Sequence, residues 1–349
     1  MTEQPVTYAQ AGVNIEAGDA AVAAIGDAVA STRRPGVLGG IGGFGGLFEL
    51  DLERYPHPVL VASTDGVGTK LAVAKATGRL STVGIDLVAM CVDDLVCCGA
   101  EPLFLLDYVA VAQLEPAELA QLVEGIAEGC RQANVALLGG ETAEHADTMA
   151  KGDFDLAGFA VGVLNRPDRL DPAMVSPGDV LIGLGSPGLR SNGYTLARHV
   201  LLERAGLPLD GPAWEGAETS LADELLRPSV IYSPAVVTLL GEHRGAIHAV
   251  AHITGGGIAQ NLARVLPPTI DATVERASFP TPQLFTEIQR LGPVEPEEMA
   301  RVFNLGLGMV VVVAADEAEA VRARFCQLGL SAMVVGSCRA GTGHVELAP

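Results

Sequence analysis

Short apolar runs alternate with amphipathic segments along the first half of the chain. Compact apolar runs bounded by glycine, proline or acidic residues are typical of strands, and apolar positions three and four apart are typical of helices. This alternation predicts a mixed α/β (α+β) fold. The predicted strands cover 57–64, 101–114, 135–141 and 155–164, and the predicted helices cover 18–31, 82–99 and 116–133.

The second half repeats this alternation without a clear sequence repeat. Between the halves, the segment 165–179 carries prolines at 167, 172 and 177, which predicts a domain boundary. We therefore expect two domains, 1–168 and 169–349. In the second domain the predicted strands are 179–186, 248–254, 303–314 and 332–338, and the predicted helices are 191–206, 258–266 and 317–329.

Composition narrows the class of protein. The chain has 349 residues, 49% of them hydrophobic, which is enough for two cores. A formal net charge of −20 argues against nucleic acid as a partner, although small phosphates can still be held by backbone N–H groups and metal. The six cysteines have no CxxC spacing, which is typical of reduced thiols. The sequence shows neither the basic and then apolar pattern of a signal peptide nor an apolar run long enough for a membrane helix. These features predict a soluble, cytoplasmic protein with no membrane partner.

The stretch ASTDGVGTK, 62–70, is the first candidate for chemistry. A strand delivers Asp65 to its end, two glycines let a ligand approach the backbone, and Lys70 can reach back as a point charge for phosphate. The spacing does not match a Walker motif. The alternative is an ordinary strand-end turn with a solvated lysine.

A glycine-dense loop, 39–46, precedes this strand. It contains G-x-G-x-x-G, but it lacks the flanking strand and helix that a dinucleotide fingerprint requires. A flap whose N–H groups face phosphates is the better interpretation, with an ordinary mobile loop as the alternative. We expect its apolar residues to act as anchors: Ile41, Phe44, Leu47 and Phe48.

Six carboxylates form a second group. Three lie on the apolar helix 82–99, where an isolated charge would be costly, so each must be paired or bind metal. Oxygen ligands of this kind suit Mg²⁺ bridging a polyphosphate. Salt bridges to Arg33, Arg34 and Lys70 could explain one or two of the acids but not all six, since cations are scarce in this chain. The six are Asp65, Asp86, Asp93, Asp94, Asp107 and Glu141.

Two segments of the second half resemble anion sites. SNGYT, 191–195, precedes a helix, and HITGGG, 252–257, joins a strand to a helix, so both would expose N–H groups to a ligand. His248 and His252 have the spacing of a helical metal pair, but their valine-rich surroundings predict a strand. His252 either hydrogen-bonds a substrate or serves as a core or capping histidine.

Several motifs occur in an order that resembles one enzyme family. DGVGTK, GIDLVAMCVDDLVCCGAEPLFLLDY, LLGGETAE, SNGYTL, AHITGGGI and FNLGLGM are similar to the phosphoribosylformylglycinamidine cyclo-ligase (aminoimidazole ribonucleotide synthetase) family, from about Tyr8 to near the C-terminus. The resemblance implies ATP-dependent closure of formylglycinamidine ribonucleotide to 5-aminoimidazole ribonucleotide, with release of ADP and phosphate. It also implies a homodimer whose N-terminal halves pair strands into a β-barrel flanked by helices, with a C-terminal α/β layer domain. The wider superfamily includes thiamine-monophosphate kinase and selenophosphate synthetase.

Roles carried over from this resemblance fall into four groups. The catalytic residues are Asp65, Lys70, Asp94 and His252. The Mg²⁺ ligands are Asp65, Asp93, Asp94, Asp107 and Glu141. ATP phosphates are assigned to Gly40, Gly42, Gly43, Gly45, Gly66, Gly68, Thr69 and Lys70, and the ribonucleotide to Ser191, Asn192, Gly193, Thr254, Gly255, Gly256 and Gly257.

The chain departs from the family pattern at three places. Ala9 and Gln10 follow the tail tyrosine where relatives often have a lysine, and HADTM, 145–149, replaces a Met-Pro-Gly segment. Arg190 stands where a histidine is common; arginine cannot titrate, but it can bind phosphate. A small-molecule kinase of the same superfamily and a non-catalytic nucleotide-binding protein are the alternatives.

Overall fold

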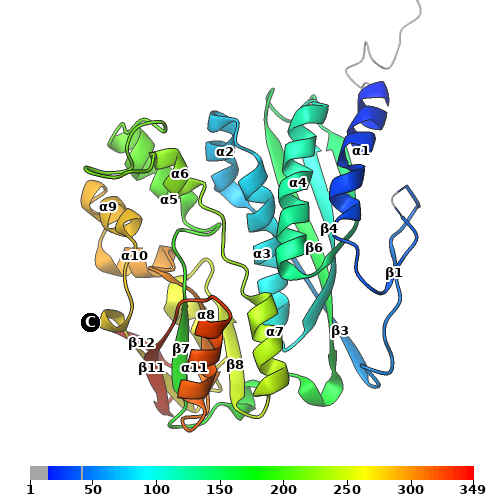
Figure 1. The fold of residues 1–349 in the computed structure, drawn as a ribbon. Coiled ribbons are helices and arrows are strands. Elements are labelled where there is room, and N and C mark those ends of the chain that lie inside the picture. Colours follow the sequence, from blue (N-terminus) through cyan, green and yellow to red (C-terminus); the bar gives the residue numbers. More distant parts are fainter. Residues whose placement is uncertain (1–14, 41) are drawn as a thin grey trace, which may run out of the picture.

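The structure is a computed structural model that describes residues 15–40 and 42–349 (Figure 1). The tail departures at Ala9 and Gln10 and the expected anchor Ile41 lie outside these residues. Helices and strands alternate through both halves, as the sequence predicted, and the strands form three sheets.

A four-stranded sheet belongs to the first half of the chain. Its strand order is β3, β6, β4, β5; β4 and β5 run parallel, and the other neighbours run antiparallel. Alternate residues of each strand point to opposite faces. The strands are β3 (Pro58–Gly66), β6 (Phe154–Asn165), β4 (Glu101–Val111) and β5 (Ala136–Glu144).

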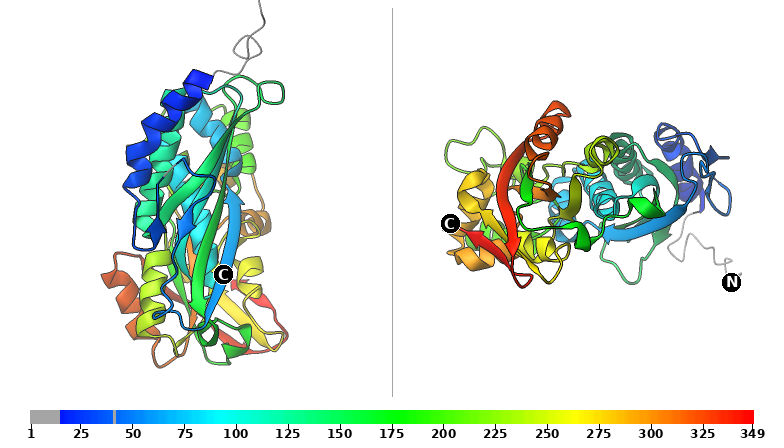
Figure 2. Two further views of the ribbon diagram at one scale, coloured as in Figure 1. Left: turned by 90° about the vertical axis from the view of Figure 1, so that its right-hand side faces the viewer. Right: turned by 90° about the horizontal axis from the view of Figure 1, so that it is seen from below.

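Helices α3 (Ser81–Cys97) and α4 (Pro116–Ala133) pack on one face of this sheet, and α1 (Ile15–Ala30) packs on α4. That face buries residues such as Leu105 and Val109. In the described part of the chain no helix lies over the other face, and the strands stand in front in the left view of Figure 2. Its apolar side chains remain exposed, among them Leu60, Phe159 and Tyr108.

A six-stranded sheet belongs to the second half, in the order β12, β9, β11, β7, β10, β8. Helices cover both of its faces, so β10 is buried throughout and its sequence LGMVVVV is continuously apolar. The strands are β7 (Val180–Gly185), β8 (Ile247–His252), β9 (Ile270–Glu275), β10 (Leu307–Val313), β11 (Ala332–Ala340) and β12 (Val345–Ala348).

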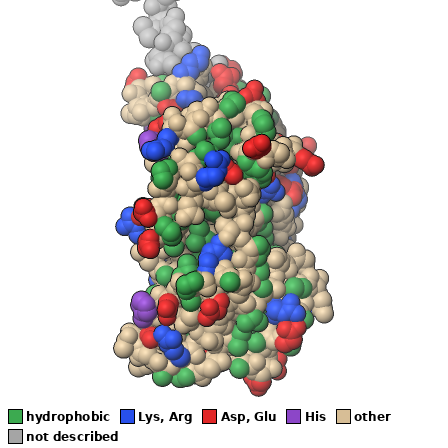
Figure 3. Space-filling model, turned by 90° about the vertical axis from the view of Figure 1, so that its left-hand side faces the viewer, with side chains coloured by type: hydrophobic (Ala, Val, Ile, Leu, Met, Phe, Trp, Pro, Cys, Tyr) green, Lys and Arg blue, Asp and Glu red, His purple; other side chains and the backbone are tan. Residues whose placement is uncertain are grey.

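The helices on this sheet form two layers. Helices α7 (Ser233–Glu242) and α11 (Ala318–Gln327) share a core cluster with Val311 and Val313, whereas α8 (Gly257–Ala263) and α9 (Gln283–Leu291) share the other cluster with Val310 and Val312. Acidic and basic side chains intermingle on the face shown in Figure 3. None of the helices within residues 15–40 and 42–349 is long and apolar enough to cross a membrane.

The smaller elements were mostly not predicted. The helix predicted at 191–206 begins later, as α5 (Tyr194–Arg198), and continues as a π-helical segment over His199–Arg204. Such predictions depend on a hydrophobic periodicity sustained over many residues. Short helices and short strands are not long enough to show it. The elements without a sequence prediction are β1 (Val37–Leu38), β2 (Leu47–Phe48), α2 (Leu71–Thr77), α6 (Leu221–Leu225), α7, α9, α10 (Pro296–Val302), β9 and β12.

Candidate functional site

The acids of α3 lie between the two sheets, and two of them are fully buried. Asp86 pairs with Lys70, with 2.5 Å between Oδ2 and Nζ, and both side chains are 0% exposed. The other carboxylate oxygen of Asp86 accepts hydrogen bonds from the N–H and hydroxyl of Ser229. The ammonium of Lys70 also donates to the carbonyls of Arg190 and Arg227. Burial lowers the pKa of Lys70, while Asp86 acts in the opposite direction.

Asp93 is enclosed in the same way, two turns further along α3. Its Oδ2 accepts from Arg190 Nη2 at 2.8 Å, and its Oδ1 accepts the N–H groups of Tyr232 and Ser233. The guanidinium of Arg190 stacks over the Tyr232 ring, 4.9 Å from its centroid. Because both oxygens of this buried carboxylate already have protein partners, Asp93 is not a suitable metal ligand.

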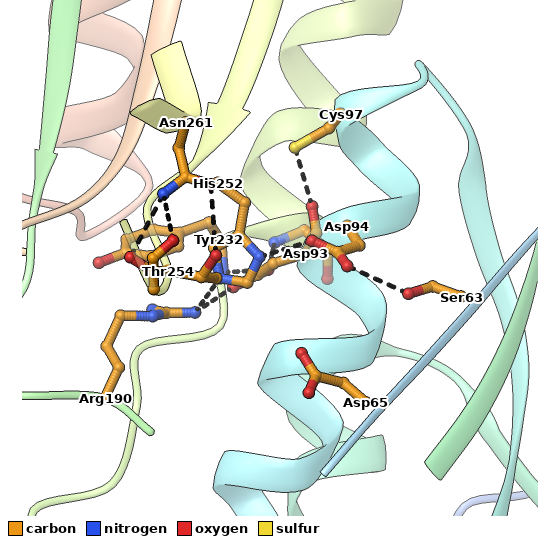
Figure 4. Close-up of polar contacts among 12 residues, drawn as sticks. Ser63, Asp65, Asp93, Asp94, Cys97, Arg190, Tyr232, His252, Thr254 and Asn261 are labelled. Atoms are coloured by element: carbon orange, nitrogen blue, oxygen red, sulfur yellow. Dashed lines mark hydrogen bonds and ion pairs between the residues drawn. The ribbon is translucent and has the colours of Figure 1, made fainter. Parts of the chain in front are cut away.

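Asp94, the next residue, faces a cavity instead. Its side chain is 43% exposed, and it accepts from His252 Nδ1 at 2.9 Å and from Ser63 Oγ at 3.1 Å (Figure 4). Burial acts to raise the pKa of Asp94, but the hydrogen bonds from His252 and Ser63 and the charge of Arg264 hold it below its usual value. This carboxylate is therefore kept ionised at the edge of a cavity of about 300 Å³.

Both ring nitrogens of His252 have partners. Nε2 lies 2.9 Å from Arg190 Nη2, and arginine can only donate, so Nε2 must be the acceptor. The proton of the neutral ring is then on Nδ1, where it is donated to Asp94. His252 is 5% exposed. In this arrangement it orients Asp94 and has no free nitrogen for a substrate, so the interpretation as a core histidine describes it better.

Asp65 and Asp107 lie in one row across the four-stranded sheet. Asp65 on β3 is opposite Gly158 on β6, which is opposite Asp107 on β4. Residues directly opposite one another project to the same face, here the face covered by α3. A Cβ at Gly158 would lie 2.8 Å from Cys91 Sγ on that helix, so only glycine fits between the two acids.

The environments of these two acids differ from that of Asp94. Burial raises the pKa of Asp65, and the neighbouring charge of Asp94 adds to this effect. Burial also raises the pKa of Asp107, to about 7. Glu141 is opposite Tyr108, the residue that follows Asp107 on β4. Because successive residues of a strand point to opposite faces, Glu141 projects to the uncovered face of the sheet. In one chain, Glu141 therefore cannot join Asp65 and Asp107 on a single metal ion.

Within the described residues, no three carboxylate, histidine or cysteine side chains converge closely enough to hold a metal ion. This finding does not favour the five-residue set predicted from the sequence. Mg²⁺, however, is usually held by one or two carboxylates together with substrate phosphates. The neighbouring carboxylates of Asp65 and Asp94 fit that kind of site, and Asp93, Asp107 and Glu141 do not extend it.

Three of the predicted binding loops meet beside these acids. Gly68 and Thr69 follow β3, and Thr69 Oγ1 lies 3.0 Å from Thr195 Oγ1 in the SNGYT segment. A Cβ at Gly255 would lie 3.7 Å from Asn192 Nδ2, which places the HITGGG segment next to SNGYT. Ser191 Oγ and Asn192 Oδ1 are buried without a hydrogen-bond partner among the described residues. Unsatisfied buried polar atoms are uncommon in native proteins.

Asn261 on α8 fixes the third loop. Its amide nitrogen donates to the carbonyls of Thr254, Gly255 and Gly257, and its amide oxygen accepts from Arg264 and from the Thr254 hydroxyl. Sequence reasoning did not select Asn261, Ser63 or Arg264. Asn261 follows HITGGG directly on the same helix, so a search for polar residues within one turn of a glycine loop would have found it.

The described part of the glycine loop, residues 39–40 and 42–46, lies elsewhere. It connects β1 and β2, and Gly46 packs so closely on β5 that a Cβ there would lie 2.4 Å from Leu138 Cγ. Since β5 and β3 are opposite edges of the sheet, the loop and Asp65 are not brought together in one chain. Phe48 packs against Phe104, but Phe44 and Leu47 are exposed and do not anchor the loop.

Two interpretations of cations need correction. Lys70 was expected to reach a phosphate, but its ammonium is enclosed against Asp86 with 0% exposure. Arginine at position 190 could in principle bind phosphate, but the Arg190 side chain is 1% exposed and bonded to Asp93. The salt-bridge alternative is thus correct for Asp86, which pairs with Lys70, whereas Asp93 pairs with Arg190, a cation that this alternative did not include.

Comparison with known proteins identifies the family. Residues 52–164 match the model of the AIR synthase related protein, N-terminal domain, and residues 176–347 match that of its C-terminal domain. The chain is 52% identical over 343 residues to the phosphoribosylformylglycinamidine cyclo-ligase of Symbiobacterium thermophilum, covering 97% of both chains. It is 49% identical to that of Trichlorobacter lovleyi, covering 97% of this chain and 96% of the relative. The chain belongs to the phosphoribosylformylglycinamidine cyclo-ligase family. The resemblance inferred from the motifs is confirmed.

Solved structures show how widely this family's fold occurs. Thiamine-monophosphate kinase from Stenotrophomonas maltophilia superposes with a TM-score of 0.70 at 20% identity, covering 93% of this chain and 95% of that one. The hydrogenase maturation protein HypE of E. coli gives 0.63 at 18% identity, covering 92% and 91%. T. maritima PurL complexed with AMPPCP gives 0.54 at 15% identity, covering 93% of this chain and 47% of that one. At these identities the similarity concerns the fold alone.

Proposed function

We propose that this protein catalyses ATP-dependent ring closure of formylglycinamidine ribonucleotide to 5-aminoimidazole ribonucleotide, with release of ADP and phosphate, in purine biosynthesis. One observation carries the proposal: three loops meet beside Asp65 and Asp94, in a chain about half identical over nearly its whole length to named cyclo-ligases. One of these loops also contains buried polar atoms without a hydrogen-bond partner among the described residues, Ser191 Oγ and Asn192 Oδ1.

The chemistry explains why such a site needs acids and backbone loops. An amide oxygen is a poor leaving group, and transfer of the γ-phosphoryl of ATP to it makes a good one. The ribosyl-bearing nitrogen then attacks the same carbon, and the oxygen leaves as phosphate. Catalysis of this kind depends on holding two reactants in line and on neutralising charge at the transferring phosphoryl group.

Asp65 and Asp94 are the residues that would hold Mg²⁺, and bound Mg²⁺ would neutralise charge on the polyphosphate. His252 and Ser63 orient Asp94 and keep it anionic. The loops Gly66–Thr69, Ser191–Gly193 and Thr254–Gly257 would then bind phosphate and ribonucleotide through backbone N–H groups and the free polar atoms of Ser191 and Asn192. Lys70 and Arg190 stabilise α3 instead, because they form buried salt bridges with Asp86 and Asp93.

We further propose that the active protein is a cytoplasmic homodimer built on the uncovered face of the four-stranded sheet. Leu60 is 64% exposed on that face and Phe159 is 43% exposed, which favours burial against a second copy. Pairing of the sheets into a barrel would also satisfy their edge strands. It offers a way to bring the glycine loop 39–46 of one subunit to Asp65 of the other, since these lie at opposite edges within one chain.

Two structural domains, 1–168 and 169–349, would fit this assembly. The family models end at 164 and begin again at 176, on either side of the proposed boundary. The first domain would then supply the dimer and the metal-binding acids, and the second would supply the ribonucleotide side through SNG and HITGGG.

A second candidate is a small-molecule kinase, since thiamine-monophosphate kinase has the same fold. The two candidates differ in their products. Purified protein would be mixed with ATP, Mg²⁺ and formylglycinamidine ribonucleotide, and aminoimidazole ribonucleotide, ADP and phosphate would be followed together. We expect equal amounts of all three. ADP without the imidazole product or free phosphate would favour a kinase, and no ATP use at all would indicate a non-catalytic nucleotide-binding protein.

A further inference from the structure

Transfer of a phosphoryl group requires positive charge beside the reacting oxygens, and the site just described contains few cations. Lys70 and Arg190 are the cations nearest the acids of α3, but their side chains are 0% and 1% exposed and each is paired with a buried carboxylate. Neither can turn toward a ligand without leaving that carboxylate unpaired. Mg²⁺ held by Asp65 and Asp94 would supply part of the positive charge, and a cationic side chain that is free to reach the ligand would supply more.

Arg264 meets this need. It follows the last residue of α8 and lines the cavity of about 300 Å³ together with Asp94, Ser63 and His252. Its side chain is exposed, and its hydrogen bond to a side chain, from Nη1 to Asn261 Oδ1, is long at 3.4 Å. Among the described residues it forms no salt bridge with a carboxylate, in contrast to Lys70 and Arg190.

The position of Arg264 is linked to that of the HITGGG loop. Asn261 accepts from Arg264 through its amide oxygen, and its amide nitrogen holds the carbonyls of Thr254, Gly255 and Gly257. One side chain thus orients both the loop and the guanidinium. Asp94, which is held by His252 and Ser63, lines the same cavity, so the cavity contains both an acid and a cation.

We propose that Arg264 binds a phosphate oxygen of one of the reactants within this cavity, a role that rests on the proposed ring-closing function. A guanidinium presents a planar fork of N–H donors that matches two oxygens of a phosphate. Arg264 and the Asp94 carboxylate would act on the same group from two sides, the arginine directly and the acid through its metal. The phosphate is either the γ-phosphoryl of ATP or the 5′-phosphate of the ribonucleotide.

The test compares Arg264→Gln and Arg264→Lys with the wild type. Arg290→Gln is the matched control, because Arg290 is an exposed arginine of α9 paired with Glu287 and outside the cavity. We expect Arg264→Gln to lower kcat/KM by about 100- to 1,000-fold, as for loss of one transition-state donor. Arg264→Lys keeps the charge without the fork, so it should recover only part of this loss. The control should stay within about 3-fold of wild type, the scatter expected for a surface substitution.

The kinetic constants distinguish the two sources of phosphate. If Arg264 binds the γ-phosphoryl of ATP, kcat falls, the KM of ATP rises while that of the ribonucleotide changes little, and added guanidinium salt partly restores the Arg264→Gln enzyme. If it binds the 5′-phosphate, the KM of the ribonucleotide rises and kcat changes little. Normal values for all three constants in Arg264→Gln would overturn the proposal.

A binding measurement keeps this test separate from the proposed function. Calorimetric titration with AMPPCP and Mg²⁺, and separately with the ribonucleotide, should show weaker binding of one of them to Arg264→Gln than to wild type and Arg290→Gln. If wild-type protein binds these compounds but makes no imidazole product, the ring-closing function fails while the role of Arg264 still stands or falls on the titration. Unchanged affinity for both compounds, with unchanged kinetics, would overturn the role of Arg264 alone.

Discussion

Replacement of Lys70 by methionine separates the two interpretations of this residue. In the structure, Lys70 neutralises Asp86 inside the protein and donates to two backbone carbonyls. Methionine keeps much of the side-chain volume but removes the charge and the three hydrogen-bond donors. Asp86 would retain the N–H and hydroxyl of Ser229 as partners, but its negative charge would be buried without a cation.

The expected loss of stability follows from this burial. Removing one partner of a buried ion pair typically costs about 3–5 kcal/mol, because the remaining charge is uncompensated. A natural domain unfolds with a free energy of about 5–15 kcal/mol, so Lys70→Met should remove a large fraction of it. The double variant Lys70→Met with Asp86→Leu should lose less than the sum of the two single variants, because it leaves no buried charge behind.

Urea unfolding followed by circular dichroism at fixed protein concentration measures this loss. Lys75→Met is the matched control: Lys75 pairs with Asp153 at the surface, where the two side chains are 41% and 42% exposed. Exposed pairs contribute about 0–1 kcal/mol, so the control should unfold at nearly the wild-type urea concentration. Enzyme assays would be run on the same samples below the unfolding transition.

One result would refute this reasoning. If Lys70→Met unfolds like Lys75→Met and instead raises the KM of ATP, the ammonium of Lys70 reaches the nucleotide in the working enzyme. The phosphate role expected from the sequence would then be restored, and the pairing with Asp86 would be a feature of the ligand-free protein.

Three further predictions concern the acids and the exposed sheet face. Asp94→Asn should lower turnover about 100-fold or more with little change in stability to urea. Asp93→Asn should instead destabilise the fold by about 2–4 kcal/mol, because only Asp93 is buried with three hydrogen-bond donors. Equal effects of the two variants on turnover and on stability would contradict these separate roles. Burial raises the pKa of Asp107 to about 7 from 3.8, so its protonated form stabilises the fold at low pH and this contribution is lost as pH rises from about 4 to about 7. Asp107→Asn should remove that fall in unfolding free energy, and an unchanged pH profile would argue against a buried neutral carboxyl. Leu60→Lys should lower the sedimentation coefficient toward that of a monomer, whereas Leu328→Lys, an exposed leucine away from the sheet face, should not. A dimer that is unaffected by Leu60→Lys would place the interface elsewhere.

The chemistry of α3 shows how far sequence reasoning could go. Three acids on an apolar helix were expected to need partners or metal, and this reasoning was correct for the two that are buried, Asp86 and Asp93. It could not decide between partners and metal, because the partner of Asp93 is Arg190, 97 residues away, and its backbone N–H donors come from Tyr232 and Ser233 at the start of α7. Nothing in the local sequence of 227–233 indicates that it would bind two carboxylates.

The local sequence pattern also could not predict which face of the first sheet a side chain points to, or which strands lie at its edges. Glu141 and Asp107 belong to adjacent strands, but their faces depend on the register of β4 with β5, which shifts at Leu105 and Leu106. The glycine loop was recognised as a loop, but its position beside β5 follows from strand order, not from its composition. Long elements such as α3, α4, β4 and β10 were predicted because their periodic signals are local.

The two buried pairs on α3 also limit how the protein can move. Lys70 and Asp86 connect α3 with Ser229, and Asp93 connects the same helix with Arg190 and Tyr232, so the halves of the chain are joined twice by charges that water does not reach. A hinge that opened along α3 would expose both pairs at once, at an energetic cost far above that of moving a surface loop. Substrate entry and product release should therefore proceed by motion of the peripheral loops, while the core that holds Asp94 keeps one geometry throughout the cycle.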